Sequence, residues 1–298
     1  MVIRAFFLML IGAQTAMAQD ASAPLRQRML ERIQAVPGAA VGVVFREVGS
    51  EATVLIDADS VFHAASTMKV PVMIEYFRQL DAGQLKKDQT LLLDTVFKSI
   101  VDGSRYSLGA GVDSDSSVFA RVGQQVPLRW LVERMIVRSS NLATNALIEL
   151  LDAKQVQATT VSLGATNMKV RRGVEDGKAF QQGLNNQTTA RDLAVLLEAI
   201  ENGKAASAAS SREMIDILAR QEFNEEIPAG LPAGTKVAHK TGWITAVQHD
   251  AAIVYPPGRK PYVLVVLTRG IRDRAIAKTL IADLSRITWD FVHAGRGD

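Results

Sequence analysis

Three short segments, in this order along the chain, carry side chains that together could perform acyl transfer: Ser66–Lys69, Ser139–Asn141 and Lys240–Gly242. They supply a hydroxyl nucleophile, two possible proton carriers, an amide and a cation suited to a carboxylate. A serine hydroxyl is a weak nucleophile at neutral pH and needs an adjacent base. A lysine that is crowded by another cation and partly removed from water has a lowered pKa and can be that base. The set therefore indicates serine acyl transfer without a histidine base.

The spacing of the first segment suits a helix. Ser66 and Lys69 are three residues apart, which puts both side chains on one helix face. The residues from Val70 to Leu80 are mostly apolar with helical spacing, so we expect Ser66 to open a buried helix. Pro71 is acceptable near such a start, where few N–H groups need a partner. The Ser66 N–H would then be a free donor, as an oxyanion requires.

Each segment taken alone has an ordinary interpretation. Ser-x-x-Lys occurs by chance in a chain of this length. Ser139–Asn141 precedes an apolar run and could simply cap a helix. Lys240–Gly242 could be a solvated turn at the end of a strand. Three such segments rarely occur together in a fixed order by chance. Their order therefore favours serine acyl transfer over the three ordinary interpretations.

At these residues the chain resembles the penicillin-recognising serine hydrolases, and among them the class A β-lactamases most closely. The resemblance covers nearly all of the chain after residue 18, from the first strands near Val41 to the last helix. It implies that Ser66 is the acylated nucleophile and Lys69 its proton partner, and that Ser139 passes a proton to the leaving nitrogen. The expected substrate is a small-molecule β-lactam.

The resemblance also implies how the substrate is held. Asn141 would contact a substrate amide, and Lys240 and Thr241 would hold the substrate carboxylate. The N–H groups of Ser66 and Trp243 would bind the carbonyl oxygen as it becomes negative. No cofactor is implied.

Three features depart from the class A pattern. Ser140 stands where that pattern has an aspartate, which we take to be supporting rather than chemical. The stretch between the first two segments is longer than the family leads us to expect. Its excess lies around Ser104 to Val122, which reads as an extended loop near the mouth of the site. Trp243 replaces a small residue, and its ring could narrow the pocket.

Deacylation rests on the weakest match. Class A enzymes activate water with a glutamate on a loop between the second and third segments, and here the candidate is Glu175. Arg172 precedes it by three residues rather than the usual two. Asp176 is a poorer candidate because its side chain is shorter, and Asn185 or Asn186 could hold the water. The alternative is a charged surface loop whose arginines pair weakly with its acidic residues.

His249 lies on the strand after the third segment, near where many class A enzymes place an arginine for the substrate carboxylate. A neutral imidazole could donate one hydrogen bond there, and a protonated one would add charge. The alternative, which we favour, is a structural histidine bonded within the sheet.

The N-terminus predicts export. Arg4, an apolar run from Ala5 to Gly12 and the sequence Ala16–Ala18 form a secretory signal with an A-x-A cleavage site, so residues 1–18 should not belong to the fold. The run is too short to span a membrane, and no other stretch reaches that length. We therefore expect a periplasmic or secreted protein, without stable membrane insertion.

Composition excludes several other classes. The net charge of +3 falls to +2 once the signal is removed, and no clustered basic stripe suggests nucleic acid. The chain has no cysteine, so its core must be stable without disulfides. We expect a monomer. No metal site is suggested, because the four histidines lack ligand spacing: His63, His239, His249 and His293.

Strand-like segments lie at both ends of the chain and helical patterns fill its middle. This order predicts an α+β fold with an antiparallel sheet built from N- and C-terminal strands, flanking helices and an inserted all-helical subdomain. We expect one β-lactamase-like catalytic domain over residues 19–298. Its α/β part would be about 19–62 and 212–298, and its helical part about 63–211.

Three functions are compatible with these residues. The first is a serine β-lactamase that hydrolyses the lactam amide through a Ser66 acyl-enzyme. The second is a D,D-peptidase-like or esterase-like hydrolase that penicillins acylate but that deacylates slowly. The third is a non-catalytic cell-wall-binding protein, against which the complete set of reactive side chains argues.

Overall fold

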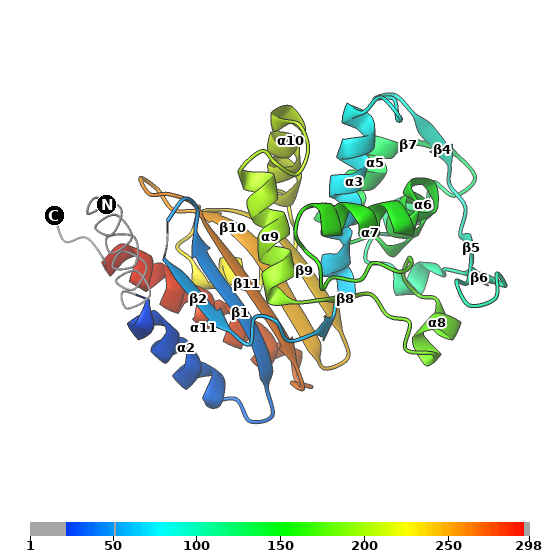
Figure 1. Ribbon diagram of the computed structural model, residues 1–298. Coiled ribbons are helices and arrows are strands. Elements are labelled where there is room, and N and C mark those ends of the chain that lie inside the picture. The colour runs from blue at the N-terminus through cyan, green and yellow to red at the C-terminus, as the bar shows by residue number, and fades with distance from the viewer. Residues whose placement is uncertain (1–21, 51, 295–298) are drawn as a thin grey trace, which may run out of the picture.

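A five-stranded antiparallel sheet forms one side of the molecule (Figure 1). The computed structural model describes residues 22–50 and 52–294, so the signal expected over residues 1–18 lies outside the described residues. The strand order β2-β1-β11-β10-β9 joins strands from both ends of the chain, which confirms the predicted sheet. The strands are β1 Ala40–Glu47, β2 Thr53–Ile56, β9 Lys236–Ile244, β10 Val247–Tyr255 and β11 Tyr262–Arg269.

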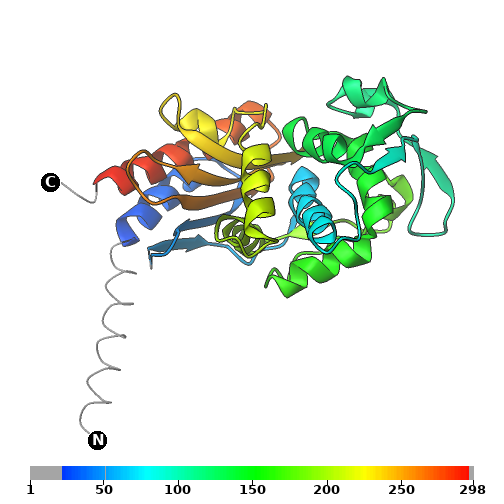
Figure 2. The same ribbon diagram turned by 90° about the horizontal axis from the view of Figure 1, so that it is seen from above.

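Helices cover both faces of this sheet (Figures 1 and 2). Successive residues of a strand point to opposite faces. In β11, Leu264 and Val266 pack with α2 and α11, whereas Val263 and Val265 pack on the other side with α9. The strand is therefore apolar without interruption. The three helices are α2 Ala23–Gln34, α9 Ala190–Glu201 and α11 Arg274–Ala294.

The middle of the chain forms a helical part around α3, Lys69–Asp81. Residues Val70 to Phe77 are all buried. A helix that is buried all round needs neighbours on every side. The other helices of this part are α4 Ser116–Phe119, α5 Leu128–Val137, α6 Asn141–Leu151, α7 Ala153–Ser162, α8 Gly177–Gln181 and α10 Ala208–Leu218.

The inserted part differs from the prediction in that it is not purely helical. It contains two short ladders, and a third pairs the segment before the Ser66 turn with the segment before α9. The boundary near residue 211 between the helical part and the C-terminal α/β part remains a prediction. Helix α9 precedes that boundary in the chain, yet it lies on the sheet. The ladders pair β4 Thr90–Leu92 with β7 Gln125–Pro127, β5 Val96–Lys98 with β6 Arg105–Ser107, and β3 Phe62–His63 with β8 Gln187–Thr188.

The C-terminal helix α11 is amphipathic and lies beside α2. Its apolar side packs on the sheet, and Asp283 on its partly exposed side accepts a hydrogen bond from Arg32 of α2 at 2.7 Å. Within residues 22–50 and 52–294, no helix combines the length and the apolar character needed to cross a membrane.

A close backbone contact fixes α11 against the 3₁₀ turn Ile227–Gly230. Ser285 donates a hydrogen bond to the Ile227 carbonyl oxygen at 2.8 Å. A Cβ atom at Gly230 would lie 2.0 Å from the carbonyl oxygen of Ala282 and 2.9 Å from the amide nitrogen of Arg286. Because both atoms are backbone, only a shift of the helix could make room.

We predict that Gly230→Ala destabilises the protein by about 1–3 kcal/mol or more, the usual result of overpacking. Urea unfolding of the variant should show a lower midpoint than wild type. Gly109→Ala is the matched control, because a Cβ atom there would meet nothing within 4 Å. Equal midpoints for Gly230→Ala and the control would contradict the close contact.

Candidate active site

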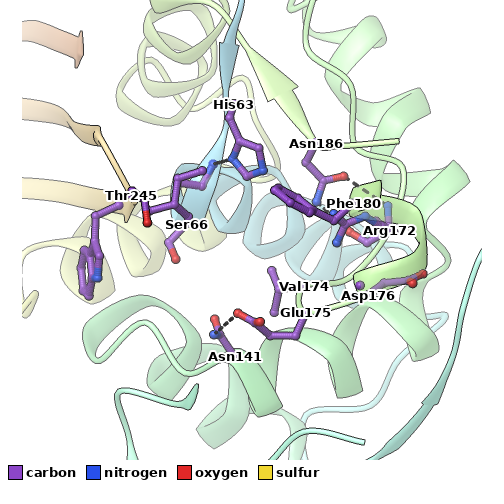
Figure 3. Close-up of a pocket in the computed structure, with 14 residues that line it drawn as sticks. His63, Ser66, Asn141, Arg172, Val174, Glu175, Asp176, Phe180, Asn186 and Thr245 are labelled. Atoms are coloured by element: carbon purple, nitrogen blue, oxygen red, sulfur yellow. Dashed lines mark hydrogen bonds between the residues drawn. The ribbon is translucent and has the colours of Figure 1, made fainter. Parts of the chain in front are cut away.

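The three sequence segments meet at Ser139, whose side chain contacts both Lys69 and Lys240. Ser66 and Asn141 face a common cavity beside this contact (Figure 3). Ser66 lies in the 3₁₀ turn Ala65–Met68 that precedes α3. Ser139–Asn141 lead into α6, and Lys240–Gly242 lie on the edge strand β9. Ser66 lines a cavity of about 450 Å³, a size typical of small-molecule sites.

The turn that carries Ser66 is held in an unusual conformation. Ala65 has φ 45°, in the left-handed region that side chains rarely adopt. Its N–H donates to Nδ1 of His63 at 3.0 Å, which stabilises this conformation. The α-helix begins at Lys69 rather than at Ser66 as expected, but the 3₁₀ turn still places Ser66 about one turn before Lys69.

The side chain of Lys69 reaches the second segment. Its Nζ lies 2.6 Å from the Ser139 carbonyl oxygen, 3.2 Å from Ser139 Oγ and 2.9 Å from Asn141 Oδ1. No hydrogen bond among the described residues joins Lys69 to Ser66. Hydrogen bonds of catalytic groups often form or shorten only in the complex with substrate. The lack of a Lys69–Ser66 hydrogen bond without substrate is therefore compatible with proton transfer between them.

Burial lowers the pKa of Lys69 well below its usual value, and the nearby charge of Lys240 lowers it further. The charges of Asp113 and Glu175 act in the opposite direction. Desolvation disfavours the charged form of a lysine. A lysine with a lowered pKa gives up its proton more readily, so Lys69 is suited to accept the proton of a nucleophile.

The Ser139 hydroxyl lies between two lysines. Its Oγ is 3.2 Å from Lys69 Nζ and 3.0 Å from Lys240 Nζ. Ser139 has φ 57°, so this residue too is in the left-handed region. Burial lowers the pKa of Lys240 to about 7, although Asp250 and Glu226 oppose the shift. A hydroxyl between two such amines can accept a proton from one side and release its own on the other.

Strand β9 passes directly against the turn that carries the nucleophile. A Cβ atom at Gly242 would lie 3.0 Å from the amide nitrogens of both Ser66 and Thr67. Glycine is therefore needed for the close approach. The approach brings the backbone around Trp243 beside the Ser66 amide, where the sequence predicts the oxyanion site.

The loop before α8 is tied to α6 by the buried side chain of Asn145. Its Oδ1 accepts from the Val174 N–H at 2.6 Å, and its Nδ2 donates to the Val174 carbonyl oxygen at 3.0 Å. A Cβ atom at Gly173 would lie 2.3 Å from Asn145 Oδ1, so the loop can pass this close only with glycine. Val174 is half-buried and lines the cavity.

Glu175 follows with φ 61° and an exposed side chain that enters the cavity (Figure 3). Its Oε1 accepts a hydrogen bond from Asn141 Nδ2 at 3.4 Å. The side-chain amide of Asn141 also contacts Lys69, so this one amide is bonded both to Glu175, the predicted base for deacylation, and to Lys69, the predicted proton partner of Ser66.

The other candidates on this loop have structural contacts. Asp176 caps α8 and accepts hydrogen bonds from Ser99 Oγ and the Ile100 N–H, both at 3.0 Å. Asn186 Nδ2 donates to the carbonyl oxygen of Arg172 at 2.8 Å, and its Oδ1 accepts from the Arg172 N–H at 3.2 Å. These bonds fix the loop, and the Glu175 carboxylate remains exposed at the cavity.

His249 is fully buried, and both of its ring nitrogens have partners. Nδ1 accepts from the Thr268 N–H at 3.1 Å, and Nε2 lies 2.9 Å from the carbonyl oxygen of His63. Burial lowers its pKa to about 4. The geometry favours the structural histidine that the sequence left as the alternative, rather than a contact to a substrate carboxylate.

Trp243 and Thr241 occupy different surroundings. The Trp243 ring lines the cavity, packs edge-on against Phe223 at 5.1 Å and lies 4.9 Å from the Arg274 guanidinium. Thr241 Oγ1 is buried without a hydrogen-bond partner among the described residues. The Thr241 hydroxyl is thus not engaged by another described residue, whereas the tryptophan ring is fixed at the border of the cavity.

Several residues that line the cavity were not identified from the sequence, among them His63, Phe180 and Arg172 as a lining group (Figure 3). No motif marks them. Arg172 is buried and donates to the carbonyl oxygens of Leu184 and Gly173, both at 3.0 Å. In the part of the chain that the structure describes, no group of three or more histidine or carboxylate side chains could hold a metal ion.

Comparisons with known proteins agree on one family. The family model described as "Beta-lactamase enzyme family" matches residues 24–292. Beta-lactamase AST-1 of Nocardia asteroides is 29% identical over 265 residues, which are 87% of this chain and 81% of the relative.

Solved structures give the same result. The structure of PBP-A superposes with a TM-score of 0.79 at 26% identity, covering 91% of this chain and 97% of that one. A β-lactamase from Sphaerobacter thermophilus gives 0.78 at 26% identity, with 90% and 98% covered. A mutant of PBP-A, solved as an acyl-enzyme complex with penicillin G, gives 0.76 at 27% identity, with 91% and 97% covered.

We predict that Gly242→Ala slows acylation of Ser66 by about 10²–10³-fold, the usual cost of losing one oxyanion donor. The added methyl group would push β9 away from the Ser66 N–H. Stopped-flow binding of a fluorescent penicillin measures the rate. Gly111→Ala is the control, since a Cβ atom there would meet nothing within 4 Å. An unchanged rate in Gly242→Ala would rule out the close approach as a catalytic requirement.

We also predict an acid-side loss of acylation that depends on His63. Burial and then the Arg172 charge lower the pKa of His63 below 6.5, while a hydrogen bond to the Asn185 side chain acts in the opposite direction. The neutral ring accepts the Ala65 N–H. As pH falls through the lowered pKa, Nδ1 becomes protonated and that bond is lost.

His63→Asn keeps an acceptor near the Nδ1 position and should lack this acid limb, whereas His63→Ala should acylate slowly at every pH. The pH profile of the acylation rate in the three proteins is the measurement. Superimposable profiles for wild type and His63→Asn would show that another group controls the limb.

Proposed function

Since the chain belongs to the beta-lactamase enzyme family, we propose that it is a serine β-lactamase that opens the lactam amide through an ester at Ser66. The observation that carries the proposal is the Ser139 hydroxyl between Lys69 and Lys240, where Lys69 also contacts Asn141, a residue that lines the same cavity as Ser66. A protein that only binds cell wall would not need two buried lysines beside a serine.

Acylation begins with the neutral amine of Lys69. It accepts the proton of Ser66 as Oγ attacks the lactam carbonyl carbon. The N–H groups of Ser66 and Trp243 stabilise the negative oxygen of the tetrahedral intermediate. The C–N bond then breaks, and the Ser139 hydroxyl gives its proton to the leaving nitrogen. Ser139 recovers a proton from Lys69, so the base is ready for the next step.

Substrate binding uses the same cleft. Lys240 and the unpartnered Thr241 hydroxyl would hold the carboxylate of the β-lactam, and Asn141 would contact its side-chain amide. Lys240 has a pKa of about 7, so an anionic ligand would favour its charged form. We further propose that the protein acts as a periplasmic or secreted monomer and binds no nucleic acid.

Deacylation needs a base near the ester, and we assign this role to Glu175. Its carboxylate enters the cavity and shares Asn141 with Lys69. It would take a proton from water as the water attacks the ester carbonyl. When the C–O bond to Ser66 breaks, that proton passes to the Ser66 oxygen, which regenerates the hydroxyl and the Glu175 carboxylate. A positioned base typically contributes about 10²–10⁴-fold to such a step.

One observation favours a second function, a penicillin-binding hydrolase that deacylates slowly. Glu175 is exposed, and among the described residues its side chain has a single hydrogen bond, of 3.4 Å, to Asn141. A relative with this fold has been captured as an acyl-enzyme with penicillin G. The two functions share acylation and differ only in how quickly the ester is hydrolysed.

We predict that Glu175→Gln acylates at a near-normal rate and then accumulates the ester, with turnover lowered by about 10²–10⁴-fold. Intact mass spectrometry after mixing with penicillin G detects the ester, and a chromogenic cephalosporin reports turnover. Glu149→Gln, an exposed glutamate of α6 outside the cavity, should behave like wild type. Ser66→Ala should gain no mass.

Three outcomes separate the hypotheses. Normal turnover by Glu175→Gln would mean that the base lies elsewhere. If the wild-type protein itself accumulates the ester, the proposed function becomes a slowly deacylating hydrolase rather than a β-lactamase. Covalent labelling of Ser66→Ala would remove Ser66 as the nucleophile.

A further inference from the structure

The middle residue of the second segment, Ser140, does not act alone at the start of α6. It is the N-cap residue, and its Oγ accepts from the Ala143 N–H at 3.1 Å. The same hydroxyl donates to Asp113 Oδ2 at 3.0 Å. Asp113 Oδ2 also accepts from the Leu142 N–H at 2.7 Å. A serine and a distant carboxylate thus share the capping of this helix.

Asp113 is itself well fixed. Its Oδ1 accepts from the Asp115 N–H at 2.8 Å. Asp115 is buried, caps α4 through the Ser117 N–H at 3.1 Å and forms an ion pair with Arg134 of α5. The carboxylate of Asp113 is therefore held by the part of its own loop that is anchored to the helical core.

The residues on either side of Asp113 contact the same short stretch. The Val112 carbonyl oxygen accepts from Asn141 Nδ2 at 2.9 Å, which turns Asn141 Oδ1 toward Lys69 Nζ at 2.9 Å. The Ser114 hydroxyl donates to the carbonyl oxygen of Arg138, the residue before Ser139. Three consecutive loop residues thus hold the backbone and side chains of residues 138–142.

This stretch needs external support because Ser139 is in the left-handed region, with φ 57°. Such a conformation persists only where surrounding contacts impose it. If the contacts are lost, the Ser139 hydroxyl moves away from the two lysines, and a displacement of about 1 Å can lower a rate by about 10²-fold.

We propose that Asp113 is a positioning residue for acylation. From the 112–114 loop, it supplies the carboxylate that the Ser-Ser-Asn segment lacks. This carboxylate holds Ser139 and Asn141 against Lys69. The proposal rests on the proposed function, because it concerns the reaction of Ser66 with a β-lactam. The longer stretch between the first two segments then has a role, since it delivers this carboxylate across the cleft.

The charge of Asp113 adds to the geometry. It is the leading influence that raises the pKa of Lys69 against burial and Lys240. A carboxylate at this place therefore both fixes the second segment and moderates the repulsion between the two buried lysines.

The test relocates the carboxylate. Asp113→Ala removes it and should slow acylation by a fluorescent penicillin about 10–100-fold. Ser140→Asp alone places two carboxylates together and should also slow acylation. The double variant Asp113→Ala/Ser140→Asp leaves one carboxylate, now within the segment, where aspartate is a preferred N-cap. It should recover to within about 5-fold of wild type, well above either single variant.

The control is Asp152→Ala, which removes an aspartate that caps α7 through the Lys154 N–H, outside the cavity. It should lower thermal stability but leave the acylation rate unchanged. If Asp113→Ala does not fold, Asp113→Asn replaces it in the same cycle, because it removes the charge and one acceptor with little change in volume.

The outcomes are distinct. Recovery in the double variant supports the proposal, because a loop contact that only stabilised the fold would not be replaced by a carboxylate on α6. Wild-type acylation by Asp113→Ala, or a double variant no faster than the slower single variant, overturns it. Failure of wild type itself to become acylated would instead overturn the proposed function.

Discussion

The structure of the cleft depends on one arrangement: a serine hydroxyl held between two buried lysine nitrogens, 3.2 Å from Lys69 and 3.0 Å from Lys240. Two cations cannot remain charged together in a buried site without a large desolvation cost. Their pKa values are therefore lowered, and each lysine can exist as a neutral amine. The same burial that destabilises their charge makes proton transfer through Ser139 possible.

Such an arrangement requires backbone that is strained at several points. Ala65, Ser139 and Glu175 all have positive φ values, and all three belong to the cleft. Left-handed residues of this kind cost on the order of 1–3 kcal/mol each and persist where neighbouring contacts impose them. Side chains bonded to backbone supply those contacts: His63 at the first, and Asp113 close to the second.

The position of the cleft follows from the chain order. The N-terminal strands form one side of the sheet and the C-terminal strands the other, so β9 becomes the edge next to the helical insertion. That edge carries Lys240 and presses Gly242 against the Ser66 turn. The site therefore exists only where three distant segments are brought together, which is why a fault in any one of them would affect the whole reaction.

The sequence by itself determined the local features. The order of the three segments, the apolar strands at both ends and the helix cap within Ser139–Asn141 are local patterns, and the structure contains each of them. The tertiary structure alone decided what depends on distant neighbours. His249 is bonded within the sheet, Asn145 anchors Val174, and Asp113 reaches Ser140 across 27 residues of chain. Local spacing sets which residues can share a helix or strand face, but burial and long-range hydrogen bonds set which charges and amides meet.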